Sequence, residues 1–395
     1  MTRPWFIVGV LILVSGALAT GVFMLLKQAS FSEVSLHYSV TPEPAAAAVE
    51  IVQDPPARHI ETPVAVKAVY MSQCLASDKT LRSRIVSLVN ETELNAIVID
   101  IKDYSGRIAF VSEDPLYADS VSPTCVVYDM SDFIESLHED GIYVIGRITV
   151  FQDPYYANLR PEFAVRKDSD REAVWKDYKG ISYLDPGSKD VWGRVVALSR
   201  ESYRIGFDEI NFDYIRFPSD GNMRDIYYPY SEEFIESDPV GGKASILRGF
   251  FSYLRKELSQ KDGMVISADL FGMTTTNRDD LNIGQILEDA LLNFDYVAPM
   301  VYPSHYPSGF IGITNPASKP YEVVRYSMDE AVKRSSTTPL KLRPWLQDFH
   351  LGADYTPDMV RAQIQAVYDS GLTSWMLWNA SNRYTKEALD LTEGR

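Results

Sequence analysis

The stretch VAVKAVYMSQCLASDK, residues 64–79, decides between the two folds that the sequence allows. It begins with a strand-like run rich in valine and alanine, and the turn that follows contains no glycine. An open, doubly wound α/β sheet would usually carry a glycine-rich phosphate-binding turn after its first strand. The absence of that turn favours a closed (β/α)8 barrel over the open sheet.

Seven further strand-like runs follow this stretch, separated by segments with helical periodicity. The eight strand candidates are residues 64–72, 95–103, 142–151, 207–215, 264–271, 294–302, 340–349 and 373–380. The helical patterns are residues 80–89, 131–139, 189–203, 246–258, 283–292 and 359–368. Strands that alternate with helices predict a parallel sheet, and eight is the number that closes a TIM barrel.

The N-terminus predicts an exported protein. Residues 5–26 contain no charged side chain, and at about 1.5 Å per residue they are long enough to cross a membrane. Arg3 precedes this segment, so we expect the rest of the chain to lie outside the cytoplasm. We interpret residues 1–27 as a transmembrane signal anchor. The alternative is cleavage near Ala19, which would release a secreted protein.

Residues 28–63 form a second unit, rich in proline, alanine and acidic residues and without sustained periodicity. Such a composition does not bury a core and predicts an extended linker. Residues 64–395 then make up the barrel domain.

The composition excludes several classes of function. The chain has 54 acidic and 38 basic residues among 395, a formal net charge of −16, which opposes binding to nucleic acid. Five histidines and two cysteines leave little for zinc, iron–sulfur or haem chemistry, so we expect no cofactor and no metal. The alternative metal site combines His305, His350 and Asp348.

The active site of a TIM barrel lies at the C-terminal ends of its strands. The richest strand end is GFDEINFDYIRFP, residues 206–218, where alternation places Asn211 and Asp213 on the face opposite to the apolar side chains. We therefore expect Asn211 and Asp213 to point into the barrel near its mouth. A buried carboxylate is costly unless it is hydrogen-bonded or catalytic. The structural alternative is an ion pair of Asp213 with Arg147 or Arg216.

A second carboxyl group, Asp269, closes the next strand run. Two carboxyl groups on adjacent strand ends suit glycoside hydrolysis, in which one protonates the leaving oxygen and the other attacks or activates water. Asp213 has a cation and Asn211 nearby to keep it ionised, and we assign it as nucleophile or base. Asp269 would keep its proton beside that charge and act as general acid, with Asp348 in reserve.

Other polar and aromatic residues that close the strands form the candidate substrate-binding set. Aromatic rings there offer apolar faces to the C–H side of a sugar. The set consists of Asp100, Lys102, Arg147, Asn211, Arg216, Tyr302, Trp345, Gln347, Asp348, Trp378 and Asn379.

The Asp213 segment, together with PMVYPSHY (299–306), RPWLQDF (343–349) and WMLWNA (375–380), resembles a bacterial family of glycoside-hydrolase-like proteins. The resemblance covers roughly residues 64–390. It implies a TIM barrel that often follows an N-terminal membrane segment and whose substrate is not settled.

More distantly, FDEINFD (207–213), MVY (300–302) and WMLW (375–378) are similar to strand motifs of chitinases. Chitinases place a general-acid glutamate two residues after the last aspartate of the first motif, and Ile215 occupies that position here. The resemblance therefore does not extend to the chitinase mechanism. The pairing of Asp213 with Asp269 is instead similar to α-amylases, although their fifth-strand acid is usually glutamate.

Taken with the composition, these patterns predict an enzyme that hydrolyses an extracytoplasmic polysaccharide or glycoconjugate. The alternative is a carbohydrate-binding or scaffolding barrel without catalysis. Cys74 follows the first strand and Cys125 lies in the long loop after the second, so both belong to the same rim of the barrel. In an oxidising compartment they could form a disulfide, and two free thiols are the alternative.

Overall fold

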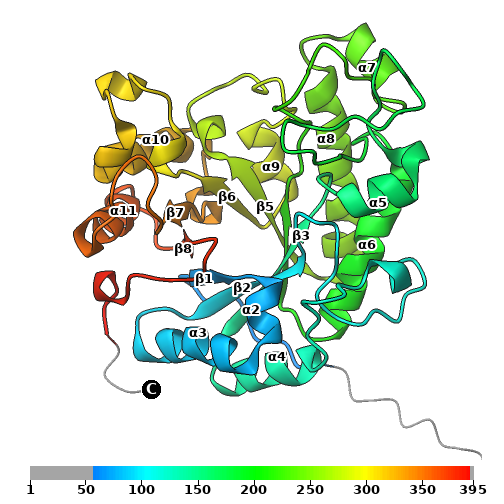
Figure 1. The fold of residues 1–395 in the computed structure, drawn as a ribbon. Helices are drawn as coiled ribbons and strands as arrows, with labels where there is room; N and C mark the ends of the chain where they lie inside the picture. Colours follow the sequence, from blue (N-terminus) through cyan, green and yellow to red (C-terminus); the bar gives the residue numbers. More distant parts are fainter. Residues whose placement is uncertain (1–56, 392–395) are drawn as a thin grey trace, which may run out of the picture. The chain divides into compact units, whose positions relative to one another are not determined.

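Eight parallel strands close into a barrel in the order of the sequence (Figure 1). This computed structural model describes residues 57–391. The strands are β1 (Lys67–Met71), β2 (Ala96–Lys102), β3 (Tyr143–Thr149), β4 (Glu209–Asp213), β5 (Val265–Phe271), β6 (Tyr296–Met300), β7 (Trp345–Gln347) and β8 (Trp375–Trp378). Each strand lies within the run predicted for it. The pairing of β1 with β8 closes the barrel, which confirms the TIM-barrel prediction and excludes the open sheet.

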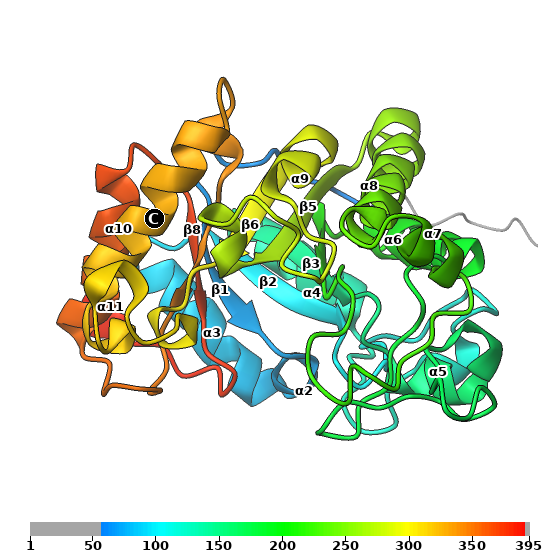
Figure 2. The same cartoon turned by 90° about the horizontal axis from the view of Figure 1, so that it is seen from above.

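Helices surround the barrel, as the view from above shows (Figure 2). They are α2 (Gln73–Ser77), α3 (Lys79–Glu91), α4 (Met130–Glu139), α5 (Pro154–Leu159), α6 (Lys189–Arg204), α7 (Glu232–Ser237), α8 (Gly242–Leu254), α9 (Leu287–Asn293), α10 (Pro320–Arg334) and α11 (Pro357–Asp369). Four of these helices, α2, α5, α7 and α10, lie outside the predicted helical patterns, and α10 is the longest of them. Its buried face includes Ser327 between the apolar side chains, which weakens the hydrophobic periodicity.

Strand alternation divides the apolar side chains into two layers. Ile97 and Ile99 of β2 belong to the core between the barrel and its helices, whereas Ala96 and Val98 belong to a smaller cluster inside the barrel. Both faces of β2 are therefore buried, as is expected for a parallel strand covered by helices.

Residues upstream of the predicted domain boundary contact the base of the barrel. The Ile60 N–H donates to Asp208 Oδ1 at 2.8 Å, Thr62 Oγ1 lies 2.9 Å from the Tyr143 hydroxyl, and the His59 ring stacks on Tyr203. The folded chain thus includes several residues that the sequence assigned to the linker. These contacts are mostly polar and involve one short extended segment, so they leave no periodic pattern.

The predicted anchor, residues 1–27, and most of the predicted linker, residues 28–63, lie outside the described residues. Within residues 57–391, no helix is both long enough and apolar enough to span a membrane.

A disulfide joins Cys74 of α2 to Cys125 in the loop after β2, with the two Cα atoms 4.4 Å apart. This confirms the bridge that the sequence left open against two free thiols. It closes a loop across 51 positions and ties α2 to the second loop of the barrel mouth.

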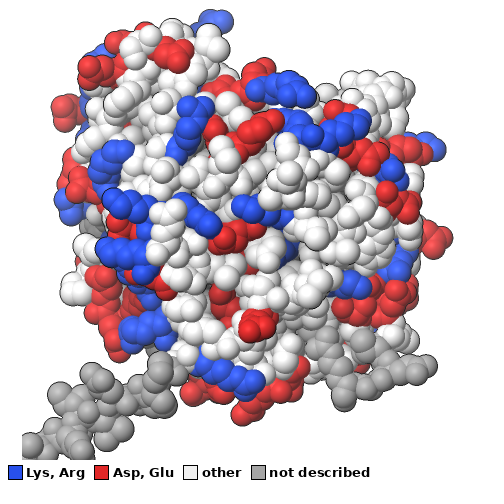
Figure 3. Space-filling model, turned by 180° about the vertical axis from the view of Figure 1, so that it is seen from behind, with Lys and Arg blue, Asp and Glu red and all other residues white. Residues whose placement is uncertain are grey.

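Charged side chains of both signs are interspersed over the face seen in Figure 3. Exposed ion pairs such as Arg200 with Asp262, 2.7 Å apart, join positions that are distant in the sequence. Pairs of this kind add little stability because water and salt screen them.

Candidate active site

Arg147 of β3 lies among three buried carboxyl groups at the mouth of the barrel. Its Nη1 donates to Asp100 Oδ1 of β2 at 2.6 Å. Its Nη2 and Nε donate to Asp213 Oδ2 of β4 at 2.6 and 3.2 Å, and Nε lies 3.9 Å from Asp269 Oδ2 of β5. Each of these four residues is at most 4% exposed. We call them the mouth cluster.

Strand register explains why these residues meet. Asp100 lies opposite Arg147 across the β2–β3 pair, and Arg147 lies opposite Asn211 across the β3–β4 pair. Side chains that alternate along each strand then point to the same interior. The sequence prediction that Asn211 and Asp213 point inward is therefore confirmed.

The predicted catalytic carboxyl groups, Asp213 and Asp269, lie close together. One nitrogen, Arg147 Nε, is within 4 Å of an oxygen of each, so these two oxygens are no more than about 7 Å apart. Catalytic carboxyl pairs of glycosidases are separated by about 5 to 9.5 Å. The upper limit of this spacing lies within that range.

Asp269 has surroundings that favour its protonated form. It accepts hydrogen bonds from Asn211 Nδ2 at 3.0 Å and from the Trp345 indole at 2.8 Å. Burial, together with the negative charge of Asp213, nonetheless raises the pKa of Asp269 well above its usual value. Asp269 is consequently the member of the pair that can supply a proton.

Asp100 is held from two sides. Its Oδ2 accepts a hydrogen bond from the Tyr70 hydroxyl at 2.5 Å, opposite the bond that Oδ1 receives from Arg147. Burial raises the pKa of Asp100 to about 6. The Tyr70 ring in turn stacks on Trp378, with the ring centres 4.0 Å apart.

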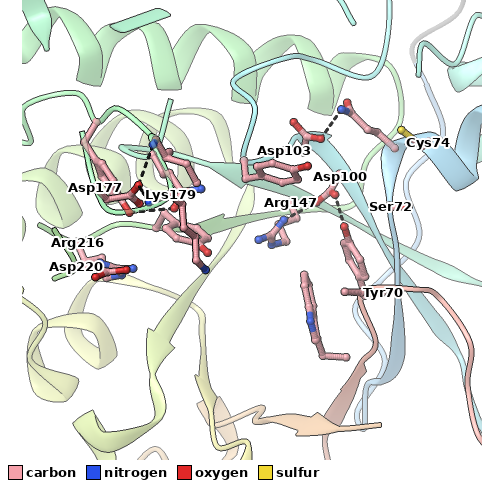
Figure 4. Close-up of a pocket in the computed structure, with 18 residues that line it drawn as sticks. Tyr70, Ser72, Cys74, Asp100, Asp103, Arg147, Asp177, Lys179, Arg216 and Asp220 are labelled. Atoms are coloured by element: carbon pink, nitrogen blue, oxygen red, sulfur yellow. Dashed lines mark hydrogen bonds and ion pairs between the residues drawn. The ribbon is translucent and has the colours of Figure 1, made fainter. Parts of the chain in front are cut away.

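A cavity of about 480 Å³ borders Asp100 and Arg147 of the mouth cluster (Figure 4). Tyr70 and Trp378 also line it. Asp103 and neighbouring residues of the first two loops line one side, and loop residues after β3 and β4 line the other. Asp213 and Asp269 do not line this cavity, whereas Arg147, which contacts both of them, does. We call this space the main cavity.

Two further features lie at the cluster. Thr149 Oγ1 and Asn211 Oδ1 are buried and have no hydrogen-bond partner among residues 57–391. Tyr214, directly after Asp213, has a φ of 51°, in the left-handed region that non-glycine residues rarely adopt. Unpaired buried groups and strained backbone are concentrated at functional sites.

Several predicted binding residues lie elsewhere or have other partners. Lys102 is buried against Asp153, with Nζ and Oδ2 2.6 Å apart, because the β2–β3 register shifts between Asp100 and Lys102. Arg216 lines the main cavity but donates to the Phe217 carbonyl and to Ser219 rather than to Asp213. Of the two ion pairs considered for Asp213, the structure forms the one with Arg147.

The predicted residues at the ends of β7 and β8 mainly form hydrogen bonds to loop residues. Gln347 accepts from the Ser304 N–H at 3.1 Å and donates to the Phe349 carbonyl at 2.9 Å. Asp348 accepts from the backbone and side chain of Thr385, and Asn379 donates to the Asp348 carbonyl. These contacts fix the loops beside the main cavity and do not belong to the mouth cluster.

The predicted aromatic residues differ in exposure. Trp378 is partly exposed and lines the main cavity. Trp345 is 1% exposed and Tyr302 is 5% exposed, and neither lines that cavity. Trp345 therefore contributes a hydrogen bond to Asp269, whereas Trp378 offers a ring face to a ligand.

The candidate metal ligands do not come together. His305 contacts the rings of Tyr302 and Phe349, while His350 accepts a hydrogen bond from the Tyr355 N–H. Among the residues that the structure describes, no group of three or more histidine, cysteine or acidic side chains has a geometry that could hold a metal ion.

Sequence reasoning missed Tyr70 and the loop residues of the main cavity. Tyr70 is a polar side chain in an inward position of β1, so strand alternation could have found it. Asp103, Asp177 and Lys179 lie in loops, which carry no periodic signal.

Comparisons with known proteins agree with this geometry. A family model described as "Putative glycosyl hydrolase domain" matches residues 68–384. No curated protein matches the chain. A hypothetical protein from Ruminiclostridium thermocellum is 31% identical, with a TM-score of 0.44, over 51% of this chain and 96% of that chain.

Two similar solved structures are glycoside hydrolases by name. The PgaB (BpsB) glycoside hydrolase domain from Bordetella bronchiseptica is 16% identical, with a TM-score of 0.58, over 84% of this chain and all of that chain. The chitobiase from Flavobacterium johnsoniae is 13% identical, with a TM-score of 0.53, over 82% of this chain and 47% of that chain. At these identities the likeness concerns the barrel fold. The family match spans most of the sequence and every strand that builds the site, so the chain belongs to this family of glycosyl hydrolase domains.

Proposed function

We propose that the domain hydrolyses glycosidic bonds in an extracytoplasmic polysaccharide or glycoconjugate, with Asp213 as nucleophile or base and Asp269 as general acid. The observation that carries this proposal is the pair of unlike carboxyl groups in the mouth cluster. Their oxygens lie within about 7 Å of each other, one is bonded to a guanidinium, and the other has a raised pKa.

The different surroundings of Asp213 and Asp269 suit them to different steps of the reaction. The Arg147 guanidinium stabilises the ionised form of Asp213, which a nucleophile or base needs. Asp269 sits between Asn211 and Trp345 and can pass its proton to the leaving oxygen. Since both carboxyl groups are buried and neither lines the main cavity, substrate reaches them only when side chains of the mouth cluster, such as Arg147, rearrange.

Arg147 thus has a positioning role in this scheme. Asp100 and Tyr70 hold one end of its hydrogen-bond network, while Asp213 accepts from the other. A substrate hydroxyl that takes over one of these bonds would leave the guanidinium anchored by the remaining carboxylate.

Export to an oxidising compartment is part of the proposal. The Cys74–Cys125 disulfide supports it, because disulfides persist mainly outside the cytoplasm. The apolar segment of residues 5–26 supports membrane anchoring. Protease added to intact spheroplasts should release a fragment that begins near residue 60, and a fully protected chain would contradict this part of the proposal.

A second candidate is a carbohydrate-binding barrel without catalysis. The observation that favours it is the direct bond between Arg147 and Asp213, since a buried arginine with carboxylate partners can be a purely structural element. In that case the main cavity would bind sugar, and the loss of the Asp213 charge would have no chemical consequence.

The experiment compares the full chain, purified in detergent, with its Asp213→Asn variant on peptidoglycan, chitin, cellulose, starch and capsular polysaccharide. Release of reducing ends by the wild-type protein alone, with both proteins folded at the assay temperature, supports hydrolysis by this site. Equal release by both proteins contradicts the assignment of Asp213. Sugar binding without release by either protein favours the second candidate.

A further inference from the structure

A second cavity, of about 580 Å³, lies beside the main cavity at the same end of the barrel. Its walls come from the loops after β7 and β8 and include Asp348, His350, Tyr355, Arg383 and Glu387. We call it the side cavity. Neither Asp213 nor Asp269 lines it, although Asp348, the reserve acid of the sequence prediction, does.

One extended segment separates the two cavities. Trp378 and Ala380 line the main cavity, whereas Asn379 and Ser381 line the side cavity. Alternate residues of the same segment thus face opposite spaces, and the wall is a single chain thick. Ala380 and Ser381 are exposed and have small side chains, so they leave room for a ligand to pass from one cavity to the other.

Tyr384 makes a second connection between the two spaces. It lines the side cavity, and its hydroxyl donates to the carbonyl of Tyr70, which lines the main cavity. The two cavities therefore share their structural support as well as their wall.

The side cavity contains hydrogen-bonding capacity that residues 57–391 do not use. The Tyr355 hydroxyl has no partner among them although the residue is only 5% exposed. His350 accepts the Tyr355 N–H through Nδ1, which leaves Nε2 to donate. The side chains of Arg383 and Glu387, both exposed, form no ion pair with any described residue.

These groups fit a neutral, hydroxyl-rich ligand better than an anion. Arg383 is the one arginine or lysine that lines the side cavity, and the carboxyl groups of Asp348 and Glu387 line it too, so a phosphate there would meet repulsion. Sugar hydroxyls both donate and accept, as this mixture of groups requires, and the rings of Phe349 and Tyr384 offer apolar contact.

We propose that the side cavity is an accessory saccharide subsite, which binds a neutral sugar unit of a chain that runs through the main cavity to the mouth cluster. The saccharide chain would pass between the cavities over Ala380 and Ser381. The inference rests on the proposed function and makes it more specific, because the substrate must then be a chain of several sugars rather than a short glycoside.

Tyr355→Phe tests the subsite with the smallest change. It removes only the buried hydroxyl that lacks a partner, so folding should be unaffected. Tyr228→Phe is the matched control, because Tyr228 is also buried and its hydroxyl also lacks a partner among the described residues, yet it lines neither cavity. Both changes are made in the full-length Asp213→Asn protein, which should not cleave the probes.

The probes are the hexasaccharides and disaccharides of cellulose, chitin and starch, with binding measured by calorimetry. We expect at least one hexasaccharide to bind, and Tyr355→Phe to weaken it about fivefold, the worth of one neutral hydrogen bond. The disaccharides should bind both forms equally, and Tyr228→Phe should change nothing. A hexasaccharide that binds Tyr355→Phe as tightly as its parent overturns the inference and leaves the proposed hydrolysis standing.

Three other outcomes also test the subsite. Equal weakening by Tyr228→Phe would show a general effect on the fold and overturn the subsite. Failure of every hexasaccharide to bind overturns it as well. If Tyr355→Phe weakens binding but the wild-type protein cleaves no chain, the subsite stands and the proposed hydrolysis fails.

Discussion

Two arginines are buried inside the barrel, one at each end, and their surroundings differ. At the base, Arg343 Nη1 donates to both oxygens of Glu209 at 3.0 Å, and Tyr143 donates to the same carboxylate. At the mouth, Arg147 is shared by the carboxyl groups of Asp100, Asp213 and Asp269. The base has one cation for one carboxylate, and the mouth has one cation for three.

Burial alone therefore does not distinguish a functional site from a structural one. Glu209 and Arg343 are as inaccessible as the mouth residues, at 0% and 1% exposed. What differs is the excess of carboxyl groups, which raises the pKa of Asp269, and the cavity that borders the cluster. The mouth therefore holds a carboxyl group whose pKa is raised well above its usual value beside one that is bonded to a guanidinium.

The largest expected effect is on catalysis at the mouth. Asp269→Asn removes the proton donor and should lower kcat on a polysaccharide by about 1,000-fold or more. The loss should be much smaller on an aryl glycoside with a good leaving group, which needs no proton. Steady-state kinetics on both substrates test this, and an equal loss on the two would show that Asp269 is not the general acid.

At the base of the barrel, replacing a buried carboxylate by its amide should lower stability rather than catalysis. Glu209→Gln leaves Arg343 without its buried carboxylate and should reduce the free energy of unfolding by about 3–5 kcal/mol. Asp213→Asn should reduce it less, because Arg147 keeps its bond to Asp100. Chemical denaturation of both variants measures the difference.

The contrast between the two ends would break down if Asp213→Asn proved the more destabilising of these variants. It would also fail if Glu209→Gln lowered kcat while the protein remained folded. Adding Arg343→Met to Glu209→Gln should recover a large part of the lost stability, since it removes the unpaired charge.

The disulfide should contribute an intermediate effect at the rim of the mouth. Replacing both Cys74 and Cys125 by serine opens a loop across 51 positions and should cost about 2–4 kcal/mol. Thermal unfolding of the double variant, with and without reductant, checks this. Reductant should destabilise the wild-type protein alone, and an equal response of both proteins would argue against the bridge in solution.

The smallest expected effect is a shift in the pH profile. Asp100 has a pKa of about 6 and must be ionised to hold Arg147, so kcat/KM should fall on the acid side near that pH. The Tyr70 hydrogen bond lowers the pKa of Asp100, so Tyr70→Phe should raise it and move the acid limb to higher pH. A limb that stays in place, or that moves to lower pH, would assign it to another group.

Hydrophobic periodicity predicted the barrel fold and the inward positions of Asn211 and Asp213. The eight strands were predicted because buried parallel strands form continuous apolar runs, and alternation within residues 207–215 placed Asn211 and Asp213 inward. These features are local, so the sequence carries them directly.

The remaining contacts depend on tertiary structure. The shift of Lys102 towards Asp153 follows from a change of register between two strands, and no single strand reveals it. Gln347 and Asn379 lie at strand ends as predicted, but their partners come from loops that the sequence does not position. The sharing of Arg147 by three carboxyl groups also appears only when four strands are assembled.

The central claim is that the mouth holds two unlike carboxyl groups, and the protonation state of Asp269 tests it without any substrate. Carbon-13 NMR of the aspartate carboxyl groups, assigned with Asp269→Asn, follows its titration in the wild-type protein and in Asp213→Asn. The account predicts that the pKa of Asp269 lies well above the usual range of an aspartate in the wild-type protein and falls when the Asp213 charge is removed. An Asp269 that titrates in the usual range, or whose titration does not respond to Asp213→Asn, would contradict it.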